Sequence, residues 1–411
     1  MPERIAVIGS GWEATLSQKL DDKKFEVIVI SPEAKTPYTP LLAAAATGMF
    51  NLSLAEEPIR HKSKNIRFMQ AKVEDIDFQK KSIHCTPAFK ELEKRPFDLE
   101  YDRVIITPGT TNQTFGTKGV EEHALFLRTV KDAYAVRSRI EDIVEQASLP
   151  HITDDERRDM LRVIVVGGGP IGVEVSAELS DLVRGDLAQL YPGFKDKFTI
   201  EVHDVADQIL PMFEKSLAGY AQKSFVRKDV KIHTSSHITE VQPGKLFTKE
   251  RGEIGFGMLI WATGNKQVSL VDTLKVSKSE KLPRILTNDR LQVLDTNGEP
   301  MKGVYALGDA ADVKGGELPT TAEVACQKAE YLSNAINTGL DKPFEYSSKA
   351  MIAYTGSADG VAAGQKEWSG ASAWMAWRAK NLDWSRSWRN RILIGVNWGL
   401  NHVFGKETFR N

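Results

Sequence analysis

Two glycine-rich segments, each directly after a short β-branched run, constrain this chain more than any other feature. The first reads GSGWEA from Gly9, a G-x-G-x-x-A frame, and the second reads GGGPIG from Gly167, a G-x-G-x-x-G frame. In such a frame the first glycine turns the chain, and the second lets the backbone approach a pyrophosphate. The unpaired N–H groups at the start of the following helix attract the negative charge of that pyrophosphate. Two frames therefore predict two bound dinucleotides exchanging electrons, the alternative being two unrelated turns.

Composition narrows the class of protein. With 411 residues the chain is long enough for two or three domains, and its 54 Lys and Arg against 55 Asp and Glu predict no nucleic-acid partner. Cys85 and Cys326 form no C-x-x-C motif, so neither a redox disulfide nor a zinc knuckle is expected, and both thiols should stay reduced in an intracellular compartment. No apolar run reaches 18 residues, so no helix is expected to span a bilayer. A strand starting by Ile5 leaves no room here for a targeting peptide, which the natural protein either lacks or loses before this numbering begins.

The order of elements predicts an α/β protein with two Rossmann-like domains, one inserted in the other. The first domain is expected over residues 1–120 and 266–345, the inserted domain over 121–265, and a helical C-terminal region over 346–411. A helix is expected within 122–146, because its apolar residues fall on one face, whereas 151–159 forms a polar bridge. Strands are expected over residues 5–8, 25–30, 103–106, 163–166, 198–202, 258–261 and 304–307.

Three short motifs support the two-dinucleotide interpretation. The strings IITPG and IWATG, ending at Gly109 and Gly264, each close a strand with small residues that let the chain pass near a cofactor. Asp309 follows an apolar strand. In flavoproteins of this layout an aspartate at that place accepts hydrogen bonds from the flavin's ribityl chain, although a helix N-cap has the same appearance. Asp204 ends the strand after the second frame, where it would bind the ribose hydroxyls and favour NADH over NADPH.

The C-terminal residues have an unusual composition. Six of the eight tryptophans lie after residue 367, and residues 374–411 carry seven Lys and Arg against two acidic residues. Tryptophan interleaved with cations and aliphatic residues is typical of helices at a membrane interface. A dimer interface or an aromatic cap on the core are the alternatives.

With these motifs in order, the chain resembles the single-subunit, non-proton-pumping type II NADH dehydrogenases, especially their fungal and plant mitochondrial branch. The matching strings cover essentially the whole chain: GSGW, SP…TPLL, TFG…GV, VVGGGPIGVE, ILPMFEKSL…YAQ, LIWATGN, ALGDAA, LPTTAEVACQKAEYL and SWRNRIL. The resemblance implies bound FAD in the first domain, NADH in the second, and two electrons passed to a quinone. It also implies peripheral attachment to the mitochondrial inner membrane and a homodimer, with a cytoplasmic location as the alternative.

The resemblance also assigns residues. Glu174 would lie near the nicotinamide and quinone, although it could instead be a helix-dipole partner. The residues expected to line FAD are Gly9, Gly11, Ser31, Thr39, Val73, Thr107, Gly109 and Asp309. Those expected to line NADH are Gly169, Pro170, Ile171, Asp204 and Gly264. Further cofactor-binding positions are expected at Ser10, Trp12, Pro32, Pro40, Gly167, Gly172, Ala262, Thr263, Gly308 and Ala322, and no metal is expected.

Two positions depart from the family pattern. The quinone-binding helix has an A-Q-x-A-x-Q motif in the family, and here Glu323 replaces the first glutamine while Gln327 keeps the second. A carboxylate there opposes the charge of reduced flavin unless it is protonated or paired. Glu13 replaces a small residue of the first frame, where it could weaken FAD binding or turn outward toward the helix dipole. We therefore keep two alternatives: a soluble NADH-dependent flavoenzyme acting on a quinone-like or enone metabolite, and a flavin-binding regulatory protein.

Overall fold

The computed structural model describes residues 2–12, 16–61, 66–194, 196–280, 282–364, 367–385 and 387–406. Its contacts divide the chain into two compact units, each built from three separate segments. Unit 1 comprises Met1–Thr36, Glu57–Thr111 and Asn265–Ser348, and unit 2 comprises Pro37–Glu56, Asn112–Gly264 and Lys349–Asn411. The last segment of the chain thus belongs with the second fingerprint.

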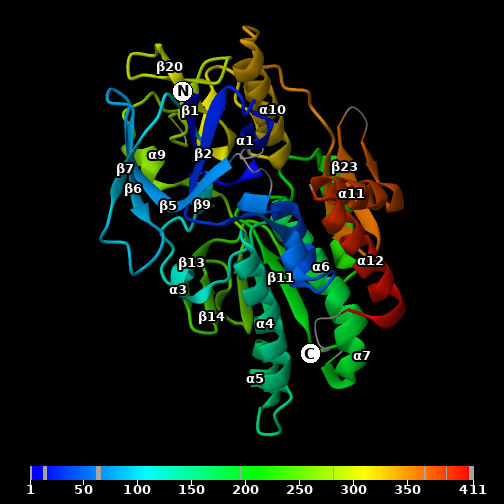
Figure 1. The fold of residues 1–411 in the computed structure, drawn as a ribbon. Coiled ribbons are helices and arrows are strands. Elements are labelled where there is room, and N and C mark those ends of the chain that lie inside the picture. Colours follow the sequence, from blue (N-terminus) through cyan, green and yellow to red (C-terminus); the bar gives the residue numbers. More distant parts are fainter. Residues whose placement is uncertain are drawn as a thin grey trace. The chain divides into compact units, whose positions relative to one another are not determined.

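Unit 1 is organised by a ten-stranded sheet of order β21-β18-β19-β20-β8-β1-β2-β5-β6-β7. Its central strands are parallel, with β1 between β2 and β8. Strands β1 and β2 are seen side by side in Figure 1. Their β-branched residues predict strands, because such side chains pack well on a pleated, buried surface. The strands are β1 (Glu3–Ile8), β2 (Phe25–Ser31), β5 (Ile66–Asp77), β6 (Ser82–Pro87), β7 (Phe97–Glu100), β8 (Arg103–Ile106), β18 (Ile285–Thr287), β19 (Gln292–Leu294), β20 (Pro300–Ala306) and β21 (Ala311–Val313).

Helices cover both faces of this sheet. Ile5 and Val7 of β1 face one cluster with α1 (Leu16–Lys19) and α10 (Ala322–Thr338), whereas Ala6 and Ile8 face the other, with α9 (Ser269–Thr273). The alternation follows from the two-residue period of a strand. Burial on both faces is typical of parallel sheets, and it leaves the carboxyl ends of the strands to carry the loops.

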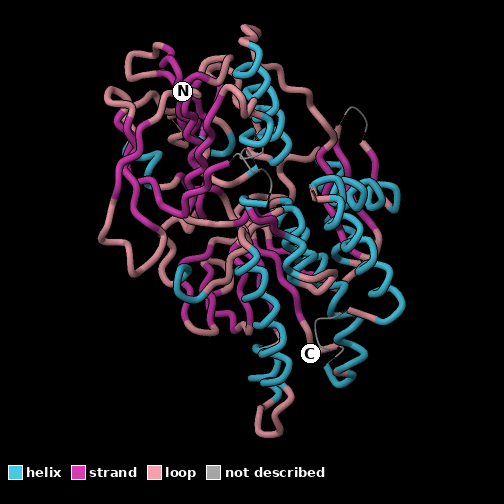
Figure 2. Tube along the Cα trace, in the orientation of Figure 1, coloured by secondary structure: helices cyan, strands magenta, loops and turns pink. Residues whose placement is uncertain are grey.

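Unit 2 contains a second, smaller parallel sheet of order β12-β11-β10-β16. An antiparallel sheet of β13, β14 and β15 and helices from distant segments accompany it (Figures 1 and 2). The elements are β10 (Arg162–Val166), β11 (Thr199–His203), β12 (Val230–His233), β13 (Ile238–Gln242), β14 (Lys245–Thr248), β15 (Gly252–Gly255), β16 (Met258–Trp261), α2 (Leu42–Ala46), α3 (Val120–His123), α4 (Val130–Ala147), α5 (Asp154–Met160), α6 (Pro170–Leu182), α7 (Ala188–Leu190) and α8 (Lys215–Val226).

Helix α4 confirms one expectation from the sequence, and its neighbour α5 corrects another. The apolar face expected within 122–146 is present: Ala133, Val136, Ile140 and Ile143 are at most 2% exposed. The stretch expected to be a polar bridge instead contains α5, because Thr153 and Glu156 form a capping box that satisfies the first backbone N–H groups. The same reciprocal cap, from Thr129 and Asp132, starts α4.

The C-terminal segment forms strands as well as helices. Strands β22 (Met351–Gly356), β23 (Asp359–Ala363) and β24 (Trp368–Ser369) make an antiparallel sheet, followed by α11 (Ala371–Trp384) and α12 (Trp388–Phe404). Figure 1 shows these elements in orange and red beside α6. Among the described residues, no helix combines the length and the apolar character needed to cross a bilayer. The remaining short strands are β3 (Lys35–Pro37), β4 (Glu56–Pro58), β9 (Thr110–Asn112) and β17 (Asn265–Gln267).

Candidate functional site

The first fingerprint forms a tightly packed turn after β1. Gly9 has φ of 110°, and a Cβ placed on it would lie 2.0 Å from the carbonyl oxygen of Thr107, so only glycine fits. The Ser10 and Ser31 hydroxyls lie 2.9 Å apart, and Thr36 Oγ1 donates to the Ser10 carbonyl at 2.7 Å. These bonds fix the backbone where the resemblance places FAD. Glu13 and Ala14 of this frame lie outside the described residues.

The expected flavin-binding residues of unit 1 gather at the carboxyl ends of its central strands. Thr107 Oγ1 donates to the Ile8 carbonyl at 3.0 Å, which ties the end of β8 to the end of β1. Gly109 has φ of 70°, and a Cβ placed on it would have no protein atom within 4 Å. Trp12 and Val73 are buried, whereas Thr39 and Pro40 belong to unit 2.

Asp309 lies inside a 3-10 turn, η7 (Gly308–Ala310), whose N-cap residue is Leu307. The helix-cap alternative for Asp309 therefore does not hold, and its carboxylate accepts a hydrogen bond from Thr110 Oγ1 at 3.4 Å. Gly308 and Asp309 line a narrow crevice with Lys328, which is only 1% exposed. Sequence reasoning missed Lys328; a lysine on the apolar face of α10 was the available signal.

The second fingerprint shows what each of its glycines does. A Cβ added to Gly167 would lie 2.7 Å from the carbonyl oxygen of Ala262, and one added to Gly172 would lie 1.8 Å from the carbonyl oxygen of Gly167. Close packing therefore requires glycine at both positions. Gly169 is the N-cap of α6 and has no atom within 4 Å of its Cβ position. That opening, at a helix start with Pro170 in its first turn, fits the approach of a pyrophosphate. Ile171 beside it is 47% exposed.

Asp204 lies at the end of β11, beside this turn. Its carboxylate accepts hydrogen bonds from the backbone N–H groups of Gly168 and Ala206, the latter at 2.8 Å. A carboxylate so held keeps further lone pairs that can accept hydrogen bonds from hydroxyl groups, which is compatible with the ribose contact expected from the sequence. After β16, Thr263 Oγ1 donates to the Gln113 carbonyl at 2.9 Å before Gly264 turns the chain with φ of 37°.

Glu174, on the first turns of α6, is enclosed by the C-terminal segment. Trp377 Nε1 of α11 donates to Glu174 Oε1 at 2.9 Å, and the Trp377 ring stacks on Tyr354 of β22 with 4.8 Å between centroids. Burial raises the pKa of Glu174 to about 8, outweighing that hydrogen bond and the positive charge of Lys380. A carboxyl group with such a pKa can hold or release a proton near neutral pH.

Glu178, one turn further along α6, is a second enclosed carboxyl group that sequence reasoning missed. It is 2% exposed, accepts a hydrogen bond from Thr47 Oγ1 at 3.3 Å, and has its pKa raised by burial to about 7. Arg378 and Lys406 oppose that shift. Asp181 continues the row and accepts a hydrogen bond from the Tyr354 hydroxyl. Glu174, Glu178 and Asp181 are at positions i, i+4 and i+7 and therefore share one face of the helix. This spacing is visible in the sequence and could have indicated the row of acidic residues.

Glu323 and Gln327, the two expected quinone-site residues, contact each other on the first turns of α10. Gln327 Nε2 donates to Glu323 Oε1 at 2.7 Å and to the Ser347 carbonyl at 3.0 Å, while Ser347 N donates to Gln327 Oε1 at 3.0 Å. Ala322 is the first residue of this helix, whose N-cap is Thr321. The glutamine side chain thus compensates part of the Glu323 charge and ties α10 to residue 347.

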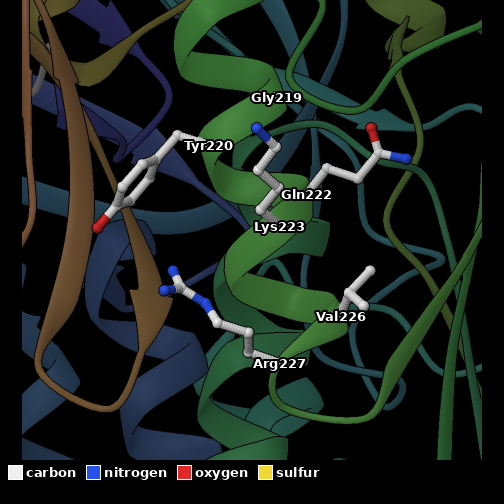
Figure 3. Close-up of a pocket in the computed structure, with 6 residues that line it drawn as sticks. All are labelled: Gly219, Tyr220, Gln222, Lys223, Val226 and Arg227. Carbon is white, nitrogen blue, oxygen red and sulfur yellow. The ribbon is translucent and has the colours of Figure 1, made fainter.

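A surface hollow in unit 2 does not coincide with these residues. It has a volume of about 660 Å³ and lies along the exposed side of α8 (Figure 3). Tyr220 at its edge points toward β23 and donates to Asp359 Oδ1 at 3.0 Å. Its lining residues are Gly219, Tyr220, Gln222, Lys223, Val226 and Arg227. One helix and the residue after it supply all of them, and none was expected to bind a cofactor.

Comparison with known proteins gives concordant results. Residues 3–329 match the family model of pyridine nucleotide-disulphide oxidoreductases. A probable NADH dehydrogenase of Dictyostelium discoideum is 31% identical over 98% of this chain and 90% of that protein. The mitochondrial external NADH-ubiquinone oxidoreductase 2 of Saccharomyces cerevisiae is 30% identical, covering 99% and 82%.

A solved structure has the same fold over its whole length. The structure of NDH2 from Plasmodium falciparum in complex with NADH has a TM-score of 0.92, with 100% of both chains covered at 23% identity. The two fingerprints, their order in the chain and the relatives therefore agree. The chain belongs to the pyridine nucleotide-disulphide oxidoreductase family and, within it, to the type II NADH-ubiquinone oxidoreductases.

Proposed function

We propose that this chain is a flavoprotein that oxidises NADH with bound FAD and passes two electrons to a quinone without pumping protons. The observation that carries the proposal is the open N-terminus of α6 at Gly169, with Asp204 held beside it. The relatives named NADH-ubiquinone oxidoreductases support the acceptor. The Glu323 departure keeps a quinone-like or enone metabolite as the alternative acceptor.

The chain's residues have separable tasks in this reaction. FAD, when bound, supplies the hydride acceptor and the two-electron donor. Gly169 admits the NADH pyrophosphate, and Asp204 holds the adenosine ribose. Glu174, with its raised pKa, is placed to supply a proton, and Trp377 fixes its carboxyl group. Gln327 orients Glu323 on α10, where the resemblance places the acceptor.

Anaerobic stopped-flow mixing tests the proposal. NADH should rapidly bleach the flavin absorbance of the purified protein, and a ubiquinone analogue should rapidly restore it. Rapid bleaching followed by slow recovery would move the acceptor from a quinone to another metabolite. Protein purified without bound flavin and unable to take it up would overturn the enzymatic proposal and favour a role other than catalysis.

Asp204→Ala should raise the Michaelis constant for NADH by about tenfold, a loss of roughly 1.4 kcal/mol, because two ribose hydrogen bonds disappear. The effect on NADPH should be smaller, since its 2′-phosphate no longer meets a negative charge. Steady-state kinetics with both nucleotides measure this. Asp207→Ala, three residues along the same loop, serves as the control. Equal losses for NADH and NADPH would contradict the assignment of Asp204 to the ribose.

Glu323→Gln should raise quinone turnover by about two- to tenfold, because it removes a negative charge from the expected acceptor site. The substitution keeps the side-chain length, so Gln327 retains a partner. Reoxidation of reduced flavin by the ubiquinone analogue is the measurement, with Glu330→Gln on the same helix as control. Unchanged quinone kinetics would place Glu323 away from the acceptor.

We also propose that α12 attaches the protein to a membrane surface. Its exposed apolar stripe consists of Trp388, Ile392, Val396, Leu400 and Val403, which are 49% to 74% exposed and recur every three or four residues. The tryptophans of α11 behave differently, since Trp377 is buried and Arg378 lies between the rings of Trp374 and Trp398, 5.0 and 4.4 Å from their centroids. The segment thus combines an aromatic cap with an exposed apolar face.

Replacing Ile392, Leu400 and Val403 together by serine should strongly reduce flotation of the protein with anionic liposomes. Each exposed aliphatic side chain lost removes about 1 to 2 kcal/mol of apolar transfer free energy. Leu190, Val205 and Val226, which are 55% to 66% exposed elsewhere in unit 2, provide the matched serine control. Truncation before α11 is a poorer test, because it removes the buried Trp377. Undiminished flotation of the α12 variant would leave dimerisation as the role of the stripe.

Location and assembly follow as further parts of the proposal. Several relatives are named as mitochondrial enzymes, which supports the mitochondrial inner membrane as the surface that α12 meets. A homodimer through the same C-terminal segment is compatible with the stripe, since two copies could cover part of it. Light scattering of the wild type and of the α12 serine variant separates the two roles.

A further inference from the structure

Three side chains that the proposed reaction does not use meet on one face of the parallel sheet of unit 2. Glu201 and His203 are two residues apart on β11, and His233 on β12 is the register partner of His203. Glu201 and His203 are 2% and 0% exposed, and the His233 side chain is 23% exposed. One ligand atom from each lies within 4.8 Å of the others.

The distances between these atoms are close to those of a coordinated ion. Glu201 Oε2 lies 2.9 Å from His233 Nε2 and 3.6 Å from His203 Nε2. Bonds of 2.0 to 2.1 Å in a tetrahedral zinc site separate ligand atoms by roughly 3.3 Å. Both distances from Glu201 Oε2 are therefore within about 0.4 Å of that separation, and all three ligand atoms lie within 4.8 Å of one another.

The second ring nitrogen of His203 is already fixed. His203 Nδ1 lies 2.9 Å from the Ser236 hydroxyl, a contact that orients the ring with Nε2 toward the carboxylate. Among the described residues, this buried Nε2 has no hydrogen-bond partner. Zinc-binding histidines usually have such an outer hydrogen bond on the other nitrogen, because it sets the tautomer and the ring orientation.

A guanidinium group lies against two of the ligand atoms. Arg251 Nη1 lies 2.8 Å from His233 Nε2 and 3.2 Å from Glu201 Oε2. The Arg251 side chain is 44% exposed on the turn between β14 and β15, so it can move into solvent. A polar hollow of about 380 Å³, lined in part by Arg251, Asp159 and Glu253, gives an ion a route to Glu201.

Two other cations lower the affinity that this site can reach. Arg162 Nε and Lys231 Nζ lie 3.4 and 3.8 Å from Glu201 Oε1, the other oxygen of the same carboxylate. Asp159 partly offsets them by pairing with Arg162 at 2.8 Å. The arrangement therefore favours a reversible site whose occupancy follows the ion concentration, in contrast to a permanent structural site.

We propose that Glu201, His203 and His233 form a binding site for Zn²⁺, which displaces the Arg251 guanidinium when it binds. Two imidazole nitrogens and one carboxylate oxygen are a ligand set that Zn²⁺ takes, with a fourth position left for water. His203 directly precedes Asp204, and Ser236 N donates to the Asp204 carbonyl at 2.9 Å. If His203 shifts when Zn²⁺ binds, Asp204, which we assign to the ribose, should shift as well. The resulting effect on NADH kinetics rests on the proposed function.

Isothermal titration of the chelator-treated full-length protein with ZnCl₂ tests the site. One ion per chain should bind, and His233→Gln should weaken binding at least about tenfold. Arg251→Gln should tighten binding, because no guanidinium then competes for the ligand atoms; a merely structural Arg251 would not give that result. His237→Gln is the matched control, because His237 Nδ1 forms a surface pair with Glu250 Oε1 at 2.7 Å. This variant should bind Zn²⁺ like the wild type.

The outcomes separate the site from the reaction. Absence of saturable binding, or equal binding by wild type and His233→Gln, would overturn the site, and unchanged affinity of Arg251→Gln would overturn the displacement. Zn²⁺ should also raise the Michaelis constant for NADH several-fold in the wild type but not in His233→Gln. Site-specific Zn²⁺ binding to a protein that does not oxidise NADH would preserve the site and refute the proposed function alone.

Discussion

Gly169→Ala is expected to leave the protein folded while raising the Michaelis constant for NADH at least about tenfold, equivalent to roughly 1.4 kcal/mol. The residue has φ of −73° and ψ of −179°, a conformation open to alanine, and no protein atom lies within 4 Å of the new Cβ. The added methyl group would instead meet the pyrophosphate. Circular dichroism melting and steady-state NADH oxidation give the two readouts.

Gly172→Ala provides the contrast three residues away. Its Cβ would lie 1.8 Å from the Gly167 carbonyl oxygen, so α6 must move away from the end of β10. This variant should lose thermal stability as well as NADH turnover. A Gly169→Ala variant with an unchanged Michaelis constant for NADH would show that the dinucleotide does not pass over this helix start.

Glu178→Gln is expected to stabilise the protein by about 1 to 3 kcal/mol at pH 8 and to change little near pH 4. Burial raises the pKa of Glu178 to about 7, so the folded chain holds this proton more tightly than the unfolded chain. The contribution of Glu178 to the free energy of unfolding is fully present below its unfolded pKa of about 4.3, and it is lost as the pH rises through 7. Urea unfolding of wild type and variant between pH 4 and 8 measures the difference.

Glu156→Gln should show the opposite pH dependence and is the control. Hydrogen bonding to Thr153 at the start of α5 lowers the pKa of the exposed Glu156, so its contribution is present at neutral pH and lost on acidification. If Glu178→Gln instead destabilised the protein at pH 8, the attraction of Arg378 and Lys406 would outweigh the cost of burying the charge.

The sequence predicted the central strands well because their physical signal is local. Runs such as residues 5–8 and 163–166 are mostly β-branched and are followed by glycine, and β1 and β10 include them. The start of α5 was also encoded locally, in the Thr153–Glu156 spacing, and was overlooked. The two glycine frames were recognised for the same reason, since each role depends on backbone within a few residues.

The enclosed polar groups could not be predicted in the same way. Glu201 and His203 alternate with apolar residues on β11, a pattern that normally marks a solvent-facing side, and only the fold shows that they are buried. Glu178 required knowledge that β22 and α11 pack near α6, a contact between segments about 180 residues apart. The tryptophans and charges of the C-terminal segment predicted helices, and they gave no indication of the strands β22 and β23.

The packing of the C-terminal segment on α6 has a consequence for biogenesis. Unit 2 draws on 37–56, 112–264 and 349–411, so its core cannot close until the ribosome has released residues at both extremes of that span. Until then the α6 surface that receives Tyr354 and Trp377 stays uncovered, a condition that favours chaperone binding or aggregation of nascent chains. Lesions in β22 or α11 should therefore appear first as low yield of soluble protein.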